Sequence, residues 1–116
     1  METLFVYGTL KKKQSNNFLL SEARFIGEGK TLQRYGLYAA GIPYVIKDEA
    51  ISQIRGEIYQ LDARTMAVVD SLEGHPNLYR REKVKVVLNK IRPEVINAWL
   101  YFYPHLQGIL IPSGEY

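Results

Sequence analysis

The sequence predicts an α+β fold in which short strands form a curled or closed antiparallel sheet beside one good helix. Short apolar segments recur along the chain with turn residues between them. Residues 62–73 alone combine a helix cap, an apolar stripe and a glycine stop. Nine of the 116 residues are tyrosines, which favour half-buried strands. At this length we expect a single domain over residues 1–116.

The first predicted strand covers residues 4–7, Leu-Phe-Val-Tyr, which all favour strands. Apolar and polar residues do not alternate in it, so we expect both of its faces to be covered. The strand ends at Gly8. A glycine there would bring bare main-chain N–H groups to the edge of the core, where a small anion or oxyanion could approach them closely. A plain turn is the alternative interpretation of these residues.

The segment between this strand and the helix contains several short elements. In order, the sequence predicts a basic loop, a short helix, a bend and three strands, at residues 11–17, 17–22, 24–30, 31–38, 44–47 and 54–61. Gly41 and Pro43 bracket a turn. Gly56, inside the third of these strands, indicates a bulge or a close approach of neighbouring backbone.

The clearest helix covers residues 62–73. Asp62 is a suitable N-cap, and Leu61 and Met66 occupy the two positions of a hydrophobic staple. Gly74 provides the C-terminal stop, and a proline two residues later prevents the helix from continuing.

Two strands and a packed tail are expected after the helix. Residues 82–88 alternate between apolar and basic side chains. Residues 94–103 are apolar or aromatic on both faces, which predicts a central strand. The tail from residue 105 contains glycines and prolines but stays apolar, so we expect it to pack against the domain.

Glu73 is the most informative residue of the chain. By helical spacing it continues the apolar stripe of Met66 and Val69, so a carboxylate occupies a core-facing position. It also lies in the last turn, where the helix dipole disfavours negative charge. Both effects raise the pKa of a carboxyl toward neutrality, as a general acid/base requires. The alternative is a salt bridge between Glu73 and Arg80 or Arg81.

The other polar residues point to no competing chemistry. We expect Asp70 to face solvent or to pair with an arginine. His75 and His105 do not have the spacing of metal ligands, so no metal site is predicted. Residues 11–13 are three lysines that we interpret as a solvated loop, since they lack the pattern of a phosphate-binding loop.

Composition excludes several classes of protein. The chain has no cysteine, which excludes disulfides, thiolate metal sites and cysteine catalysis, and which is compatible with the cytoplasmic location that we expect. No segment approaches the roughly 18 apolar residues of a membrane span, and no signal peptide is visible. The net charge of +3 is too small and too scattered to indicate a nucleic-acid partner.

Two segments resemble the signatures of the gamma-glutamylcyclotransferase-like superfamily. Residues 6–11, Val-Tyr-Gly-Thr-Leu-Lys, are similar to its N-terminal signature, and residues 69–74, Val-Asp-Ser-Leu-Glu-Gly, to its second. The resemblance covers nearly the whole chain, and the branch that the chain resembles most is the gamma-glutamylamine cyclotransferases. It implies a small, mostly antiparallel β-barrel with flanking short helices and a cavity over the end of the first strand.

The resemblance also implies roles for particular residues. Glu73 would be the catalytic acid/base, and the substrate would be held by Tyr7, Gly8, Thr9 and Leu10. A further candidate for the cavity wall is Tyr79, whose alternative role is that of a core tyrosine with a satisfied hydroxyl. The Thr9 hydroxyl either orients the substrate or caps the turn at Lys11. Lys13 departs from the family, whose members often carry glycine there, and this leaves the shape of the entrance loop open.

The implied activity is a cofactor-independent gamma-glutamylcyclotransferase of acyltransferase or lyase type. It would cyclise a small-molecule γ-glutamyl substrate by intramolecular aminolysis, releasing 5-oxoproline and an amine or amino acid. The leaving half would be selected by residues 42–44 and the tail. The alternatives are a non-catalytic module that binds a small ligand or a protein, and a weak nucleic-acid binder. The particular γ-glutamyl compound and the oligomeric state stay open.

Overall fold

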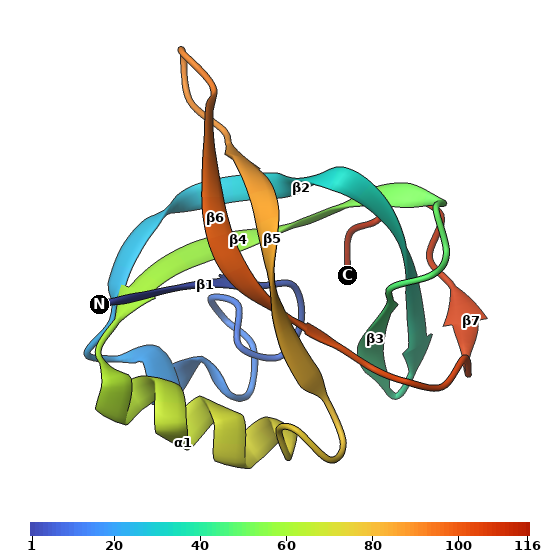
Figure 1. The fold of residues 1–116 in the computed structure, drawn as a ribbon, viewed down its shortest axis with the longest axis horizontal. Coiled ribbons are helices and arrows are strands. Elements are labelled where there is room, and N and C mark those ends of the chain that lie inside the picture. The colour runs from blue at the N-terminus through green and yellow to red at the C-terminus, as the bar shows by residue number, and fades with distance from the viewer.

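A computed structural model describes residues 1–116 as a small mixed β-barrel with one α-helix and one 3-10 turn (Figure 1). The strands are β1 (Glu2–Val6), β2 (Arg24–Ala40), β3 (Ile42–Ile46), β4 (Ser52–Leu61), β5 (Arg80–Leu88), β6 (Glu94–Phe102) and β7 (Ile109–Leu110). The helix α1 comprises Ala63–Glu73, and the 3-10 turn η1 comprises Asn17–Leu20. No helix in the structure has the length and apolar composition needed to span a bilayer.

The barrel closes through β2. The strand order is β3-β2-β4-β1-β6-β5, and β5 pairs again with β2, so five strands form a closed ring. All pairs are antiparallel except β1 with β6, which run parallel. The predicted closed and mostly antiparallel sheet is therefore confirmed. So is the central position of β6, which lies between β1 and β5.

Both faces of β1 are covered, as its sequence predicts. Phe5 and Tyr7 belong to a core cluster that is built from residues of β1 to β6. Leu4 and Val6 belong to a second cluster, which includes Met66 of the helix α1 and other residues of α1, η1 and the barrel. Alternate residues of β1 thus enter two different cores, which explains why the strand shows no alternation of polarity.

β2 differs most from expectation. The sequence predicts a bend over residues 24–30, but these residues belong to one strand of 17 residues. Its pairing with β4 shifts register between Phe25 and Gly27 and again between Lys30 and Arg34. Such bulges bend a strand without ending it, so β2 can curve around the barrel and pair with β3, β4, β5 and β7 (Figure 1).

The helix begins and ends as predicted. The side chain of Asp62 accepts a hydrogen bond from the Thr65 N–H at 2.8 Å. Gly74 adopts the left-handed conformation of a C-cap, with φ of 66°. The tail also packs as expected, because β7 pairs with β2 and the Arg55 N–H donates to the Gly114 carbonyl at 2.8 Å.

Candidate active site

A cavity of about 260 Å³ lies between the end of β1, the β2–β3 turn and the C-terminal end of α1. All six candidate site residues line it: Tyr7, Gly8, Thr9, Leu10, Glu73 and Tyr79. They come from positions up to 72 residues apart in the chain, and the barrel brings them to one place. Glu73 is the only residue with a formally charged side chain in the lining.

Glu73 occupies the position that its helical spacing predicts. Met66 and Val69 of the same stripe are buried, and the half-buried Glu73 follows them. Its carboxyl makes no hydrogen bond or ion pair within the protein, and burial raises its pKa to about 7. The alternative of a salt bridge to Arg80 or Arg81 is wrong, because Arg81 pairs with a different carboxylate and Arg80 pairs with none.

Main-chain donors lie at the end of β1. The N–H groups of residues 7–10 donate no hydrogen bond to any other main-chain group of the protein. Three carbonyls of this loop do accept bonds: Gly8 from the Lys11 N–H (3.0 Å), Thr9 from the Asn16 N–H (2.9 Å) and Leu10 from Asn17 Nδ2 (2.8 Å). The loop is therefore held through its carbonyls, which leaves its N–H groups to bind an anion or a developing oxyanion.

Gly8 is required for a reason that the sequence does not reveal. A Cβ atom at this residue would lie 2.4 Å from Cγ of Pro43, so close packing of β3 excludes any side chain. The hydroxyl oxygen of Thr9, next in the chain, accepts a hydrogen bond from Asn16 Nδ2 at 2.9 Å. The Thr9 hydroxyl therefore keeps its own proton for donation, and it does not cap the turn at Lys11.

The two candidate tyrosines have satisfied hydroxyl groups. The Tyr7 hydroxyl donates to the main-chain carbonyl of Tyr101 at 2.9 Å, and the Tyr79 hydroxyl donates to that of Pro43 at 3.1 Å. Burial raises the pKa of both phenols, so both stay protonated at neutral pH. Tyr79 thus combines its two expected roles, since it is a buried tyrosine with a partner and also lines the cavity.

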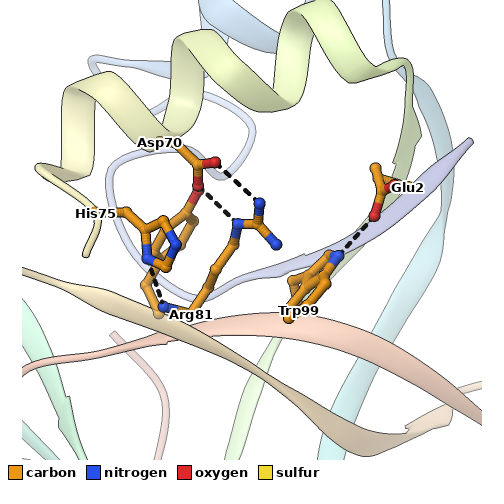
Figure 2. A network of polar contacts seen from close by, with 6 residues as sticks. Glu2, Asp70, His75, Arg81 and Trp99 are labelled. Carbon is orange, nitrogen blue, oxygen red and sulfur yellow. Dashed lines mark hydrogen bonds and ion pairs between the residues drawn. The ribbon is translucent and has the colours of Figure 1, made fainter.

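A polar network holds the last turns of α1 against the barrel (Figure 2). The Oδ1 atom of Asp70 accepts hydrogen bonds from Arg81 Nε at 2.7 Å and from the Tyr101 hydroxyl at 2.6 Å. Its Oδ2 atom accepts from Arg81 Nη2 at 3.0 Å. The guanidinium also lies 4.2 Å from the ring centroid of Trp99, whose Nε1–H donates to Glu2 at 2.7 Å. Of the two alternatives predicted for Asp70, solvent exposure or pairing with an arginine, the pairing is confirmed.

The mouth of the cavity is largely apolar, and the exposed Ser15 is its polar member. It includes Ile42, Leu72 and Leu78, which are 46%, 44% and 49% exposed. Ile42 lies in the segment that was expected to select the leaving half, but no residue of the tail lines this cavity. The sequence analysis does not predict that Leu72 and Leu78 line the cavity. Leu72 gives one hint, since it is an apolar residue of the helix that does not belong to its buried stripe. Leu78 gives none.

Lys13 adopts the left-handed conformation, with φ of 67°. Glycine favours this backbone region, and members of the family that the chain resembles often have glycine at this position. The entrance loop therefore keeps a glycine-type backbone although its side chain is lysine.

Lys13→Gly is expected to raise the free energy of unfolding by about 0.5–1 kcal/mol, because it removes left-handed strain at a modest entropic cost. Urea unfolding measures this change. Gln14→Gly, at an exposed neighbour without positive φ, is the control and is expected to be neutral or destabilising. Equal effects of the two substitutions would contradict the prediction.

A larger cavity, of about 320 Å³, lies elsewhere and is lined mainly by polar and charged residues, among them Glu28, Lys30, Arg55 and Glu115. The carboxylates of Glu28 and Glu115 are exposed to solvent. Glu57 also lines this cavity and is half-buried, but its Oε1 accepts hydrogen bonds from the Lys12 N–H (2.9 Å) and the Tyr59 hydroxyl (3.0 Å). The larger cavity therefore contains no unpaired buried acid and none of residues 7–10, so the smaller cavity is the candidate active site.

The barrel and its site define a class of small protein in which a desolvated acid and a loop with unpaired main-chain N–H groups line one cavity. The family model described as "Gamma-glutamyl cyclotransferase, AIG2-like" matches residues 4–116. MJ1514 of Methanocaldococcus jannaschii is 49% identical over 117 residues, which cover 100% of this chain and 96% of that protein. The chain belongs to the AIG2-like gamma-glutamyl cyclotransferase family.

Two mammalian proteins are also similar. The human gamma-glutamylaminecyclotransferase is 36% identical over 97 residues, which cover 76% of this chain and 63% of that protein. The crystal structure of an AIG2-like protein from Mus musculus superposes with a TM-score of 0.89 at 26% identity, covering 100% of this chain and 88% of that one. The barrel fold is thus shared with a relative whose structure was solved by experiment.

Proposed function

We propose that this protein is a gamma-glutamylcyclotransferase in which Glu73 is the general acid/base. The observation that carries the proposal is one shared cavity. It is lined by an unpaired carboxyl with a pKa of about 7 and by residues 7–10, whose N–H groups donate to no main-chain acceptor. A γ-glutamyl group matches this pair, since its α-ammonium must lose a proton and its carbonyl must become an oxyanion.

In the proposed reaction Glu73 takes one proton from the substrate and later gives it to the leaving group. The ionised Glu73 carboxylate takes a proton from the α-ammonium group of the substrate. The resulting amine attacks the γ-carbonyl carbon and closes a five-membered ring, and the N–H groups of residues 7–10 stabilise the oxyanion or hold the α-carboxylate. The attack leaves an extra proton on the ring nitrogen. As the amide C–N bond breaks, Glu73 returns its proton to the departing nitrogen, and the ring nitrogen releases its extra proton, which the departing amine takes up to become an ammonium ion. The products are 5-oxoproline and a free amine.

The reaction needs little beyond positioning and proton transfer. The nucleophile and the electrophile belong to one molecule, so ring closure already has the advantage of proximity. The remaining tasks are to fix the substrate conformation, to deprotonate the amine and to exclude water. A half-buried acid in a largely apolar cavity can perform all three.

The leaving half is best matched by an uncharged amine, as in the gamma-glutamylamine branch. A γ-glutamyl amino acid carries a second carboxylate next to the scissile amide, and no Lys or Arg side chain lines the cavity to pair with it. An alkylamine would instead rest on the apolar mouth formed by Ile42, Leu72 and Leu78. The similarity to the human gamma-glutamylaminecyclotransferase also supports this choice.

Release of 5-oxoproline from γ-glutamyl-n-butylamine and from γ-glutamyl-alanine tests the function and its selectivity. We expect kcat/KM for the butylamine donor to exceed that for the alanine donor by at least about tenfold, because an unpaired carboxylate near the cavity is costly. Ile42→Ser is expected to lower kcat/KM for butylamine alone. Leu106→Ser, an exposed apolar position outside the cavity, is the control.

Three outcomes decide between the interpretations. Preference for the alanine donor would contradict the amine selectivity but not the activity. No 5-oxoproline from any γ-glutamyl donor would contradict the activity. Tight binding of 5-oxoproline without turnover, seen by isothermal titration, would favour a non-catalytic binding module on the same fold.

A further inference from the structure

We propose that Glu57 is a positioning residue for the substrate loop, residues 7–10, although Glu57 lies outside the cavity of the candidate active site. It holds the two peptide groups on either side of Lys11, one directly and one through two other side chains. The inference rests on the role that is proposed above for the N–H groups of residues 7–10. It adds a residue that would act on the substrate only through the shape of this loop.

The direct connection is a hydrogen bond from the loop to the half-buried carboxylate of Glu57 on β4. Its Oε1 atom accepts from the Lys12 N–H at 2.9 Å. This N–H belongs to the peptide group between Lys11 and Lys12, and the carbonyl of the same group accepts from the Gln14 N–H at 3.0 Å. Both sides of that peptide group are therefore held, and Glu57 holds one of them.

The second connection leads from Glu57 to the carbonyl of Leu10. The Tyr59 hydroxyl donates to Glu57 Oε1 at 3.0 Å and accepts from Asn17 Nδ2 at 3.3 Å. Because Nδ2 carries two hydrogens, it also donates to the Leu10 carbonyl, at 2.8 Å. Burial raises the pKa of Tyr59 to about 12, so its hydroxyl keeps the proton that it donates. The carboxylate thus anchors a chain of bonds that ends on the last residue of the substrate loop.

The planarity of the peptide group transmits this constraint to the main-chain donors. The Leu10 carbonyl and the Lys11 N–H belong to one planar group, so fixing the carbonyl also fixes the N–H. The Lys11 N–H donates to the Gly8 carbonyl at 3.0 Å. That carbonyl shares another planar group with the Thr9 N–H, and the two point in opposite directions. The Thr9 N–H is therefore directed away from the turn, and it donates to no main-chain acceptor.

The sheet itself does not favour a glutamate at this position. Glu57 lies directly opposite Glu28 in the pairing of β4 with β2, and like charges opposite each other are destabilising. Three cations, Lys11, Lys30 and Arg55, line the same larger cavity, yet Glu57 makes no ion pair with any of them. Its carboxylate is bound to the loop instead. A residue that breaks a local rule of the sheet is a candidate for a functional role.

Glu57→Ala tests the proposal, because it removes both connections and leaves the lining of the candidate active site unchanged. Exchange of the Lys11 N–H with water, followed by NMR, is expected to accelerate at least about tenfold as the turn loses its anchor. We expect kcat/KM for γ-glutamyl-n-butylamine to fall by about 10- to 100-fold, since displaced donors stabilise the transition state less well. Circular dichroism selects a temperature at which the variant is folded.

Two further variants separate positioning from a general structural role. Glu57→Gln keeps Oε1 as an acceptor for both donors, so it is expected to restore the exchange rate and most of kcat/KM. Glu28→Ala is the matched control, because Glu28 lies opposite Glu57, lines the same cavity and makes no ion pair. We expect it to change neither measurement.

Four results would overturn the proposal. They are unchanged Lys11 exchange in Glu57→Ala, faster exchange there with unchanged kcat/KM, equal losses in Glu57→Gln and Glu57→Ala, and a comparable loss in Glu28→Ala. If Glu57→Ala does not fold, Asn17→Ala decides, since it removes the bond to the Leu10 carbonyl and should also accelerate Lys11 exchange.

The exchange measurement needs no turnover, so the inference and the proposed activity can fail separately. Faster Lys11 exchange in Glu57→Ala, in a protein whose wild type releases no 5-oxoproline from any donor, would reject the proposed activity alone. Normal turnover of wild type and Glu57→Ala with equal exchange rates would reject this inference alone.

Discussion

Glu73→Gln is expected to lower kcat/KM for a γ-glutamyl donor by about 10²- to 10⁴-fold, the usual contribution of a general base. Glutamine keeps the size of the side chain but cannot accept the α-ammonium proton. The wild-type rate should rise with pH through about 7, because only the ionised carboxyl acts as the base. The variant should lose this dependence. Steady-state release of 5-oxoproline between pH 5 and 9 measures both effects.

Glu28→Gln is the matched control for this prediction. It neutralises an exposed carboxylate in the larger cavity and is expected to leave kcat/KM and its pH dependence unchanged. Near-full activity of Glu73→Gln would show that the acid/base lies elsewhere. A large loss in Glu28→Gln would move the site to the larger cavity.

The same substitution is expected to stabilise the fold at alkaline pH, by up to about 2–3 kcal/mol at pH 8. Burial raises the pKa of Glu73 from 4.5 to about 7, so between these values the folded state holds a proton that the unfolded state has lost. Wild-type stability therefore falls as pH rises through this window, at about 1.4 kcal/mol per pH unit for this group. Glutamine carries no charge, so the variant avoids this loss.

Urea unfolding at pH 4.5 and at pH 8 measures the predicted difference. Wild type and Glu73→Gln should differ little at the lower pH, where the carboxyl is protonated in the folded state and still about half protonated in the unfolded state, and most at the higher pH. A stability difference that does not change with pH would mean that Glu73 is not desolvated. Glu28→Gln again serves as the control, since an exposed carboxylate should give no such dependence.

Much of the fold follows from local signals. The strand at residues 4–7 and the helix with its caps were predictable because their signals lie within a few residues of each other. The full extent of β2 was not predictable, because the sequence alone interprets its glycines at residues 27 and 29 as a bend. Only the pairing with β4 and β5 reveals that the chain bends there without leaving the sheet.

The features of the site also divide into those that local sequence signals predict and those that depend on distant residues. The place of Glu73 was predictable from one helical stripe, and the family signatures indicated residues 7–10. The partner of Arg81 was not predictable, because successive residues of a strand face opposite sides and only the register of β5 decides which arginine faces α1. The need for glycine at residue 8 was also hidden, since it depends on Pro43, which lies 35 residues away.

The enclosure of β1 between β4 and β6 bears on how the molecule is made. During translation β1 is synthesised before both of its neighbours, and the second neighbour, β6, is complete only when residues 94–102 have been added. Until then one edge of β1 is bare, and the cavity around Glu73 lacks the part of its wall that Tyr101 of β6 supplies. The complete cavity would thus form only after residues 94–102 have been synthesised and the ring of strands has closed.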